Sequence, residues 1–310
     1  MSLQCVKGNF RTVSTDRPID YIARTRRYYE GLGYGPAYVW AHYADVPFQP
    51  LKKPLADSRV ALVTTAAPYQ PDKGDQGPGA PYNAAAKFYK VYAAPTGFDP
   101  DLRISHLAID RHHTTAEDQN SYFPLPALRR ARAKGRVGAL AREFFGLPTN
   151  RSQHTTVAVD CPDLLERVRS NGVDAVILVA NCPVCHQSVS LAARCLEENG
   201  ISTVIMGCAR DIVEHVGVPR FVFSDFPLGN AAGRPGDRAS QDLVMAIALE
   251  VLEEASTPRT TRQTPLTWSD TSAWKDDYCN IAKLTPQEIA ARRAAFDRGK
   301  AVARQLRDVN

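Results

Sequence analysis

The chain has 310 residues, of which 44% are hydrophobic and 23% are charged. This composition supports a buried core and excludes an intrinsically disordered protein. The net charge is only +5 and the basic residues are dispersed, so nothing in the sequence requires nucleic acid. No apolar run approaches the roughly 20 residues of a membrane span.

Four elements are expected in the first half of the chain, after an aromatic and Arg-rich arm. The run RVALVTT at Arg59–Thr65 is rich in β-branched residues and predicts a strand. A long loop rich in Pro and Gly follows, and the apolar segment Ile104–Ile109 predicts a second strand. A helix is expected over residues 123–135, followed by a short strand at Val137–Leu140.

The second half has a more regular pattern. Residues 160–172 predict a helix that has Asp160 as its N-cap and ends before a glycine. The apolar run Asp174–Ala180 predicts a strand that is buried on both faces. Further strands are expected at Ile201–Met206 and Arg220–Phe223, with helices between them.

This alternation of strands and helices predicts an α/β fold with mostly parallel sheets and flanking helices. We expect two Rossmann-like lobes around a cleft and a helical N-terminal arm. We also expect a helix capped by Asp237, and a C-terminal helix that opens with a capping box of Thr285 and Glu288. The expected boundaries are 1–56 for the arm, 57–150 for the first lobe, 151–260 for the second lobe and 261–310 for the C-terminal extension.

Ligands of open parallel sheets bind at the carboxyl ends of the strands, which gives a set of candidate residues. The strand at 174–180 leads into CPVCH, residues 182–186, and the next two strands lead into Cys208 and Asp225. The other candidates, for catalysis or for holding an anionic substrate, are His106, Asp110, Arg111, Asn230 and Arg234. For His106 a place in the core stays open, and for the Asp110–Arg111 pair a salt-bridged loop.

The CPVCH segment allows four interpretations. In the first, Cys182 caps the following helix, whose dipole lowers the thiol pKa, and Cys185 is placed to form a disulfide with it. In the second, zinc is bound by these two cysteines, Cys208 and one His. The third is c-type haem attachment and the fourth a purely structural pair. We adopt thiol chemistry, with no bound metal and no cofactor-binding residues.

The chain has seven cysteines, an odd count that argues against a disulfide scaffold. It favours a reducing compartment, and the N-terminus shows no apolar segment of a secretory signal. We therefore expect a cytoplasmic protein. The cysteines to which we assign structural roles are Cys5, Cys161, Cys195 and Cys279.

Two long strings resemble the selenoprotein B family of glycine, sarcosine, betaine and D-proline reductases. They are DAVILVANCPVCHQ (174–187) and GISTVIMGCARDIVEHVGVPRFVFSDFPLGNAAGRPGD (200–237), and similar text extends over residues 17–275. The resemblance implies reductive cleavage of a carbon–heteroatom bond by a chalcogen nucleophile. Selenocysteine often occupies that position in the family, whereas here Cys182 stands there, with Cys185 as its partner. The amino-acid reductases also use a pyruvoyl-bearing subunit and a selenoprotein acceptor.

The expected function is a thiol-dependent oxidoreductase acting on a C–S, C–Se, C–N or C–halogen bond of a small anionic substrate. Cys182 would be the nucleophile, and Cys185 would resolve the product to a disulfide. A self-sufficient cysteine pair suits attack on a soft heteroatom, because thiol exchange cannot open a thioether. His186 or His106 would supply a proton. The reductant would be an external thioredoxin-type donor.

Two alternatives remain open. One is a cofactor-independent cysteine racemase, which needs a second thiol from the opposite lobe, and residues 57–150 contain no cysteine. The other is a non-catalytic subunit that binds thiols or metal. The expected partners are a small-molecule substrate, a thioredoxin-like reductant, and either further copies of the chain or the subunits of a reductase complex. No nucleic-acid or membrane partner is expected.

Overall fold

The computed structural model describes residues 17–104 and 106–309. The strands of its main sheet are β1 (Arg59–Thr64), β3 (Tyr92–Pro95), β5 (Ala139–Leu140), β6 (Glu143–Gly146), β7 (Ala175–Val179), β8 (Ser202–Gly207), β9 (Arg220–Phe223) and β10 (Thr260–Gln263). A separate antiparallel ribbon is made by β2 (Ala67–Pro68) and β4 (Leu102–Arg103). The α-helices are α1 (Tyr21–Gly31), α2 (Leu125–Ala133), α3 (Gln153–Thr155), α4 (Cys161–Ser170), α5 (Pro183–Glu198), α6 (Arg210–Val216), α7 (Arg238–Glu254) and α8 (Pro286–Val309).

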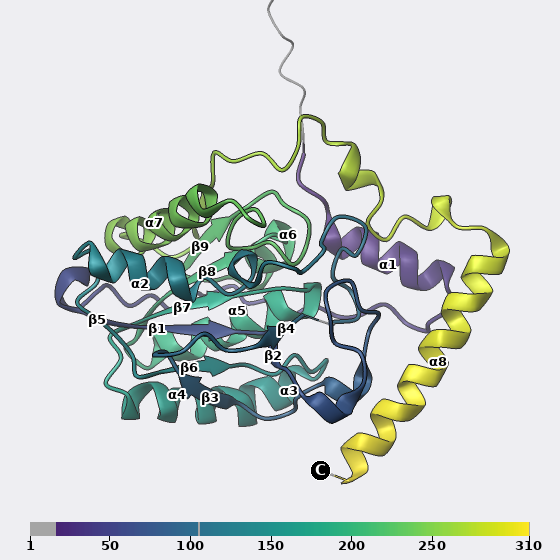
Figure 1. The fold of residues 1–310 in the computed structure, drawn as a ribbon, viewed down its shortest axis with the longest axis horizontal. Coiled ribbons are helices and arrows are strands. Elements are labelled where there is room, and N and C mark those ends of the chain that lie inside the picture. Colours follow the sequence, from purple (N-terminus) through teal and green to yellow (C-terminus); the bar gives the residue numbers. More distant parts are fainter. Residues whose placement is uncertain (1–16, 105, 310) are drawn as a thin grey trace, which may run out of the picture.

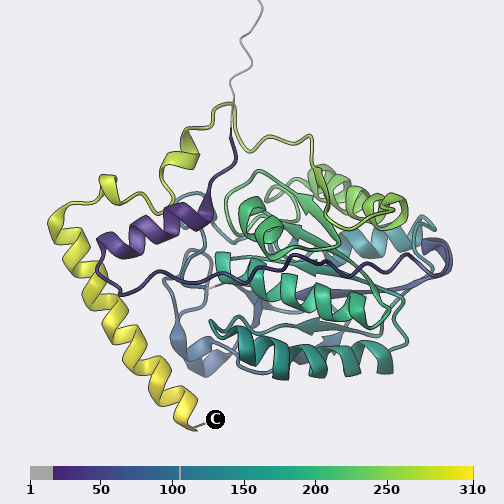
Figure 2. The same ribbon diagram turned by 180° about the vertical axis from the view of Figure 1, so that it is seen from behind.

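The main sheet has the strand order β10-β9-β8-β7-β1-β6-β3, and β5 pairs with β1 (Figure 1). Every pair in it is parallel except that of β3 with β6. Helices α4 and α5 pack side by side on one face, and α2 and α7 cover the other (Figure 2). The predicted α/β class, with a mostly parallel sheet and flanking helices, is confirmed.

The strands expected in two lobes belong to this one sheet. Strand β1 pairs with β7 over five consecutive positions. All five residues of β7 are buried, as is β1 beyond its first residue. Both strands have hydrogen-bonded neighbours on each side, so an unbroken apolar sequence fits them. The direct pairing of the two strands means that no gap between sheets separates the expected lobes.

The predicted strand at Ile104–Ile109 is wrong. Strand β4 ends at Arg103, and a turn follows. The Arg111 guanidinium donates hydrogen bonds to the carbonyl oxygens of His106, at 2.6 Å, and Leu107, at 3.2 Å. These carbonyl oxygens therefore accept hydrogen bonds from a side chain, whereas in a strand they would accept them from the backbone of a neighbouring strand. Leu107 is also 45% exposed.

Of three predicted helix N-termini, one cap is wrong and two are confirmed. Asp160 does not cap α4, because the residues before it are already helical and its carboxylate accepts a hydrogen bond from the Asn150 amide at 2.8 Å. The Asp237 cap of α7 is confirmed. The capping box is also confirmed, since Glu288 accepts from the Thr285 N–H at 2.8 Å and Thr285 accepts from the Glu288 N–H at 3.2 Å.

The N-terminal arm and the C-terminal extension lie together beside the sheet (Figure 2). The rings of Tyr21 and Tyr278 meet edge to face with centroids 5.1 Å apart, and Arg24 donates to the Tyr278 carbonyl at 3.4 Å. Further along, Phe296 of α8 stacks on Tyr34 at 3.8 Å. These contacts fix α1 in place. None of the helices in residues 17–104 and 106–309 is long and apolar enough to cross a membrane.

Candidate functional site

The start of α5 places the cysteine pair. Strand β7 ends at Val179, and Cys182 is the N-cap of α5, with Pro183 in the first turn. Proline suits this place because it has no N–H that would need a partner. The N–H of Cys185 donates to the Cys182 sulfur at 3.2 Å. The predicted capping position of Cys182 is therefore confirmed.

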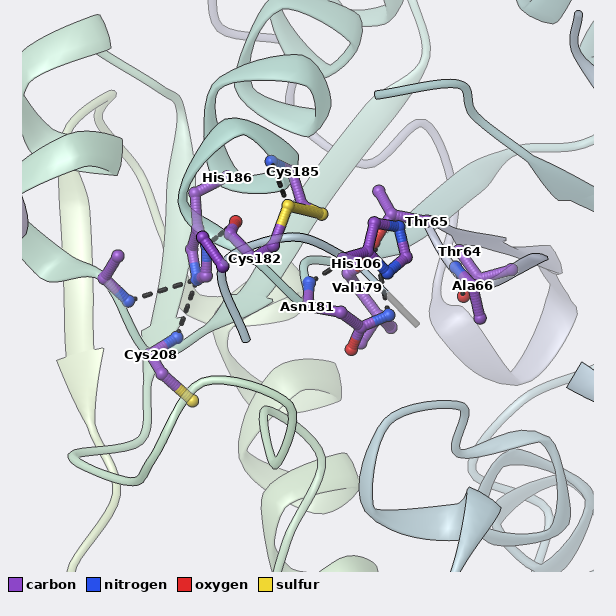
Figure 3. The surroundings of a disulfide bond; sticks show 12 residues. Thr64, Thr65, Ala66, His106, Val179, Asn181, Cys182, Cys185, His186 and Cys208 are labelled. Atoms are coloured by element: carbon purple, nitrogen blue, oxygen red, sulfur yellow. Dashed lines mark hydrogen bonds between the residues drawn. A yellow bond between two sulfur atoms is a disulfide. The ribbon is translucent and has the colours of Figure 1, made fainter. Parts of the chain in front are cut away.

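Cys182 and Cys185 form a disulfide in the structure, with their Cα atoms 4.8 Å apart (Figure 3). This separation lies within the range that disulfides require. The two residues differ in accessibility: Cys182 is 6% exposed and lines a cavity of about 150 Å³, whereas Cys185 is 0% exposed. Cys182 therefore forms part of the cavity wall, whereas Cys185 is fully buried.

Most of the cavity wall comes from outside the cysteine loop. Its aromatic residues are Tyr29, Tyr38, Trp40, Tyr82 and Phe88. They reach the cavity from α1, from the segment that follows it and from the Pro- and Gly-rich loop. The aromatic residues of the N-terminal arm stand out in the sequence, and three of them contribute to this wall. Their position beside Cys182 is seen in the structure and not in the sequence.

Lys87 and Arg151 are the charged residues of the lining, and the sequence analysis missed both. Neither side chain has a carboxylate partner among the side chains that the structure describes, and no Asp or Glu among them lines the cavity. Burial lowers the Lys87 pKa, and the positive charge of Arg151 lowers it further. The guanidinium of Arg151 lies 5.1 Å from the ring centroid of Tyr38. The cavity is therefore positively charged and can hold an anion.

His106 lies in the cavity wall together with Cys182, on the other side of the disulfide from His186 (Figure 3). Burial lowers the His106 pKa to about 4, and the charges of Lys87 and Arg111 act in the same direction. Its Nδ1 atom is buried and has no hydrogen-bond partner among the residues described. At neutral pH the ring is therefore uncharged.

His186 is held by three hydrogen bonds and is not part of the cavity lining. Its Nδ1 donates to the Cys182 carbonyl at 2.8 Å, and its Nε2 accepts from the N–H groups of Cys208, at 2.8 Å, and Ala209, at 3.1 Å. Burial lowers its pKa to about 4. A Cβ atom at Gly207 would lie 2.7 Å from the ring. This packing leaves His186 joining α5 to β8, without access to the cavity.

Asp110 and Arg111 lie in the loop next to His106, outside the cavity lining. Besides the His106 carbonyl, Arg111 binds the Ala80 carbonyl at 3.1 Å. Asp110 is buried, accepts from the His112 N–H at 3.2 Å, and has a pKa that burial raises. Both residues shape the loop that presents His106.

The remaining predicted substrate-binding residues lie at the ends of β8 and β9, also outside the cavity lining. They are Cys208, Asp225, Asn230 and Arg234. Asp225 forms an ion pair with Lys275 at 2.5 Å. Burial raises the Cys208 pKa, and the negative charge of Asp225 raises it further. The other two hydrogen-bond to neighbouring loops. The ends of β7, β8 and β9 therefore meet at one edge, and of these three strands β7 is the one whose end reaches the cavity.

Cys161, Cys195 and Cys279 are free thiols, and Cys5 lies outside the described residues. Within the described lining Cys182 is the single cysteine, so no second thiol faces it across the cavity. Among those same residues, no group of three or more His, Cys, Asp or Glu side chains is arranged to hold a metal ion.

The chain is similar to subunits of known reductases. It is 30% identical over 207 residues to D-proline reductase subunit gamma of Acetoanaerobium sticklandii, in a match that covers 66% of this chain and 82% of that subunit. It is 26% identical to glycine reductase complex component B subunit gamma of Carboxydothermus hydrogenoformans, covering 60% of this chain and 43% of that one. For the subunit of the same name from Symbiobacterium thermophilum, the identity is 24%, with 74% and 53% covered. The chain thus spans about half the length of the glycine reductase subunits. No protein-family model and no solved structure matches it.

Proposed function

The chain belongs to the family of D-proline reductase gamma subunits and glycine reductase component B gamma subunits, and from this premise we propose a thiol-dependent oxidoreductase. It would reductively cleave the bond between carbon and a soft heteroatom in a small anionic substrate. One observation carries the proposal: Cys182 caps α5 and lines the cavity, while its disulfide partner Cys185 is buried behind it.

In the reduced protein, Cys182 attacks as the thiolate. The N-terminus of α5 and the Cys185 N–H stabilise this negative charge, as they do for N-cap cysteines in general. The thiolate attacks sulfur, selenium or halogen of the substrate. A bond from the Cys182 sulfur to the heteroatom forms, the carbon–heteroatom bond breaks, and the electron pair stays on carbon.

Cys185 then completes the reaction. Its thiolate attacks the Cys182 sulfur and expels the heteroatom as thiolate, selenolate or halide, which leaves the disulfide. The two electrons of the dithiol have passed to the substrate carbon, which takes up one proton. Solvent supplies that proton. The role that we propose for the neutral ring of His106, in the cavity wall, is to hold the water that delivers it. An external dithiol donor of the thioredoxin type reduces the disulfide again.

The test is the turnover of α-thio-, α-seleno- and α-halo-carboxylates with dithiothreitol as reductant. Turnover is measured as the release of thiol or halide from the substrate. Cys182→Ser is expected to abolish turnover. In a single turnover without dithiothreitol, Cys185→Ser is expected to release the reduced carbon product and to keep the sulfur or selenium group bound to Cys182. Cys195→Ser, in the same helix but outside the cavity lining, is the matched control and should keep wild-type activity.

Full activity of Cys182→Ser with any cleaved substrate would disprove the proposal. A second measurement does not depend on the choice of substrate: the rate of alkylation of Cys182 against pH. We expect a thiol pKa well below about 8.5, the value of an unperturbed cysteine. If turnover needs added partner subunits, as the names of the relatives suggest, the same variants are compared in the reconstituted complex.

A further inference from the structure

The cavity beside Cys182 has three sources of positive charge that lack a negative partner. Two are the side chains of Lys87 and Arg151, for which no carboxylate is found among the side chains that the structure describes. The third is the N-terminus of α5, since Cys182, Pro183 and Val184 belong to the lining and α5 is a helix of 16 residues. The charge on Lys87 is unfavourable here, because its burial and the nearby Arg151 both lower its pKa. A bound anion would remove this penalty.

Aromatic side chains form much of the remaining wall, which also includes the polar residues Thr25, Asn83, His106 and Thr149. Five aromatic side chains contribute to it, and the rings of Tyr38 and Trp40 meet edge to face with centroids 4.9 Å apart. Flat unsaturated groups pack well between such rings. An ammonium group could also lie on an aromatic face, but the face of Tyr38 already has the Arg151 guanidinium beside it. A second cation would be repelled by Lys87 and Arg151.

We propose that this cavity binds a carboxylate that has a flat, apolar body and no ammonium group. Lys87 and Arg151 hold the carboxylate, the aromatic residues enclose the body, and the heteroatom faces Cys182. The assignment rests on the proposed function in taking the cavity as the substrate site. It narrows the substrate from small anions in general to aryl- or alkenyl-substituted carboxylates, and it excludes free α-amino acids.

Binding to the oxidised protein tests this class without any turnover. Four probes separate the ring from the charge. Phenylacetate, phenethylamine and the zwitterion phenylglycine all have the phenyl ring but differ in charge, and acetate has the carboxylate without the ring. Fluorescence of Trp40 in the cavity wall reports binding, and Trp40→Phe identifies its part of the signal. We expect phenylacetate to bind at least tenfold more tightly than each of the other three.

Charge-neutral variants locate the carboxylate. Lys87→Met and Arg151→Met should each weaken phenylacetate binding roughly tenfold, which is the loss expected for one charge-assisted hydrogen bond. Lys90→Met is the matched control, because Lys90 is exposed and outside the lining, and should bind like the wild type. In the reduced protein, phenylacetate should slow the alkylation of Cys182.

Several results would overturn the assignment. They are equal or tighter binding of phenethylamine, phenylglycine or acetate, unchanged binding by both charge-neutral variants, and phenylacetate binding that leaves Cys182 alkylation unaffected. These outcomes differ from a failure of the proposed function, which would appear as turnover by Cys182→Ser. Neither the binding measurements on the disulfide form nor the alkylation of the reduced form requires turnover, so the two proposals can fail separately.

Discussion

The hydrogen bonds of His186 predict a measurable loss of stability in acid. The Nε2 atom accepts from two backbone N–H groups and can do so only while it carries no proton. The His186 pKa is about 4 in the folded protein and about 6.5 in an unfolded chain. The unfolded state therefore binds more protons between these values. The contribution of His186 to stability is complete above pH 6.5 and is lost as the pH falls toward 4.

The size of this effect follows from the two pKa values. Between pH 7 and pH 5, protonation of His186 in the unfolded chain lowers the free energy of unfolding by about 2 kcal/mol. His106, whose pKa is also about 4, adds a second contribution in the same direction. In His186→Gln the first contribution disappears and the second remains. The glutamine amide can replace some of the hydrogen bonds, so the variant is expected to fold with reduced stability at pH 7.

The assay is urea unfolding of the oxidised protein at pH 7 and at pH 5. The stability difference between the two conditions should be smaller in His186→Gln than in the wild type by about 2 kcal/mol. His154→Gln is the control, since His154 is exposed on α3, and should keep the wild-type difference. An unchanged difference in His186→Gln would refute the assignment of His186 as a neutral acceptor.

Two further substitutions test the packing around the site. Glu197→Ala removes the partner of Arg220 from a fully buried ion pair at 2.8 Å and should lower the free energy of unfolding by about 3–5 kcal/mol. The exposed neighbour Glu198→Ala should change it by less than about 0.5 kcal/mol, and equal effects in urea unfolding would contradict the reasoning. Gly207→Ala places a methyl group against the His186 ring and should cost about 1–3 kcal/mol. An unchanged thermal midpoint would show that the ring has room to move.

The cysteine site could be predicted because its signals are local. The apolar run that forms β7, followed by a helix start with proline in its first turn, identifies a strand-to-helix connection within fifteen residues. The rule for strand ends then places Cys182 at the edge of the sheet. The same rule correctly places Cys208 and Asp225 at the same edge of the sheet as Cys182. It carries no information about which of these side chains face a cavity.

The cavity wall could not be predicted, since it depends on contacts between distant parts of the chain. Tyr29, Lys87 and Arg151 lie far from Cys182 in sequence, and each belongs to a segment without a strong periodic pattern. The edge strands β3 and β10 were missed for a related reason. Their side chains are only partly buried, so their sequences, YAAP and TTRQ, lack an apolar run.

The contact between the chain's two extensions has a consequence for synthesis on the ribosome. Helix α1 supplies Thr25 and Tyr29 to the cavity wall, yet α1 is held by Tyr278 and by a hydrogen bond from Arg24 to the Lys275 carbonyl. These partners emerge from the ribosome about 250 positions after α1, when the sheet can already have formed. A nascent chain therefore holds Cys182 and Cys185 in an incomplete cavity until its last segments arrive, and the cavity wall is the last part of the molecule to mature.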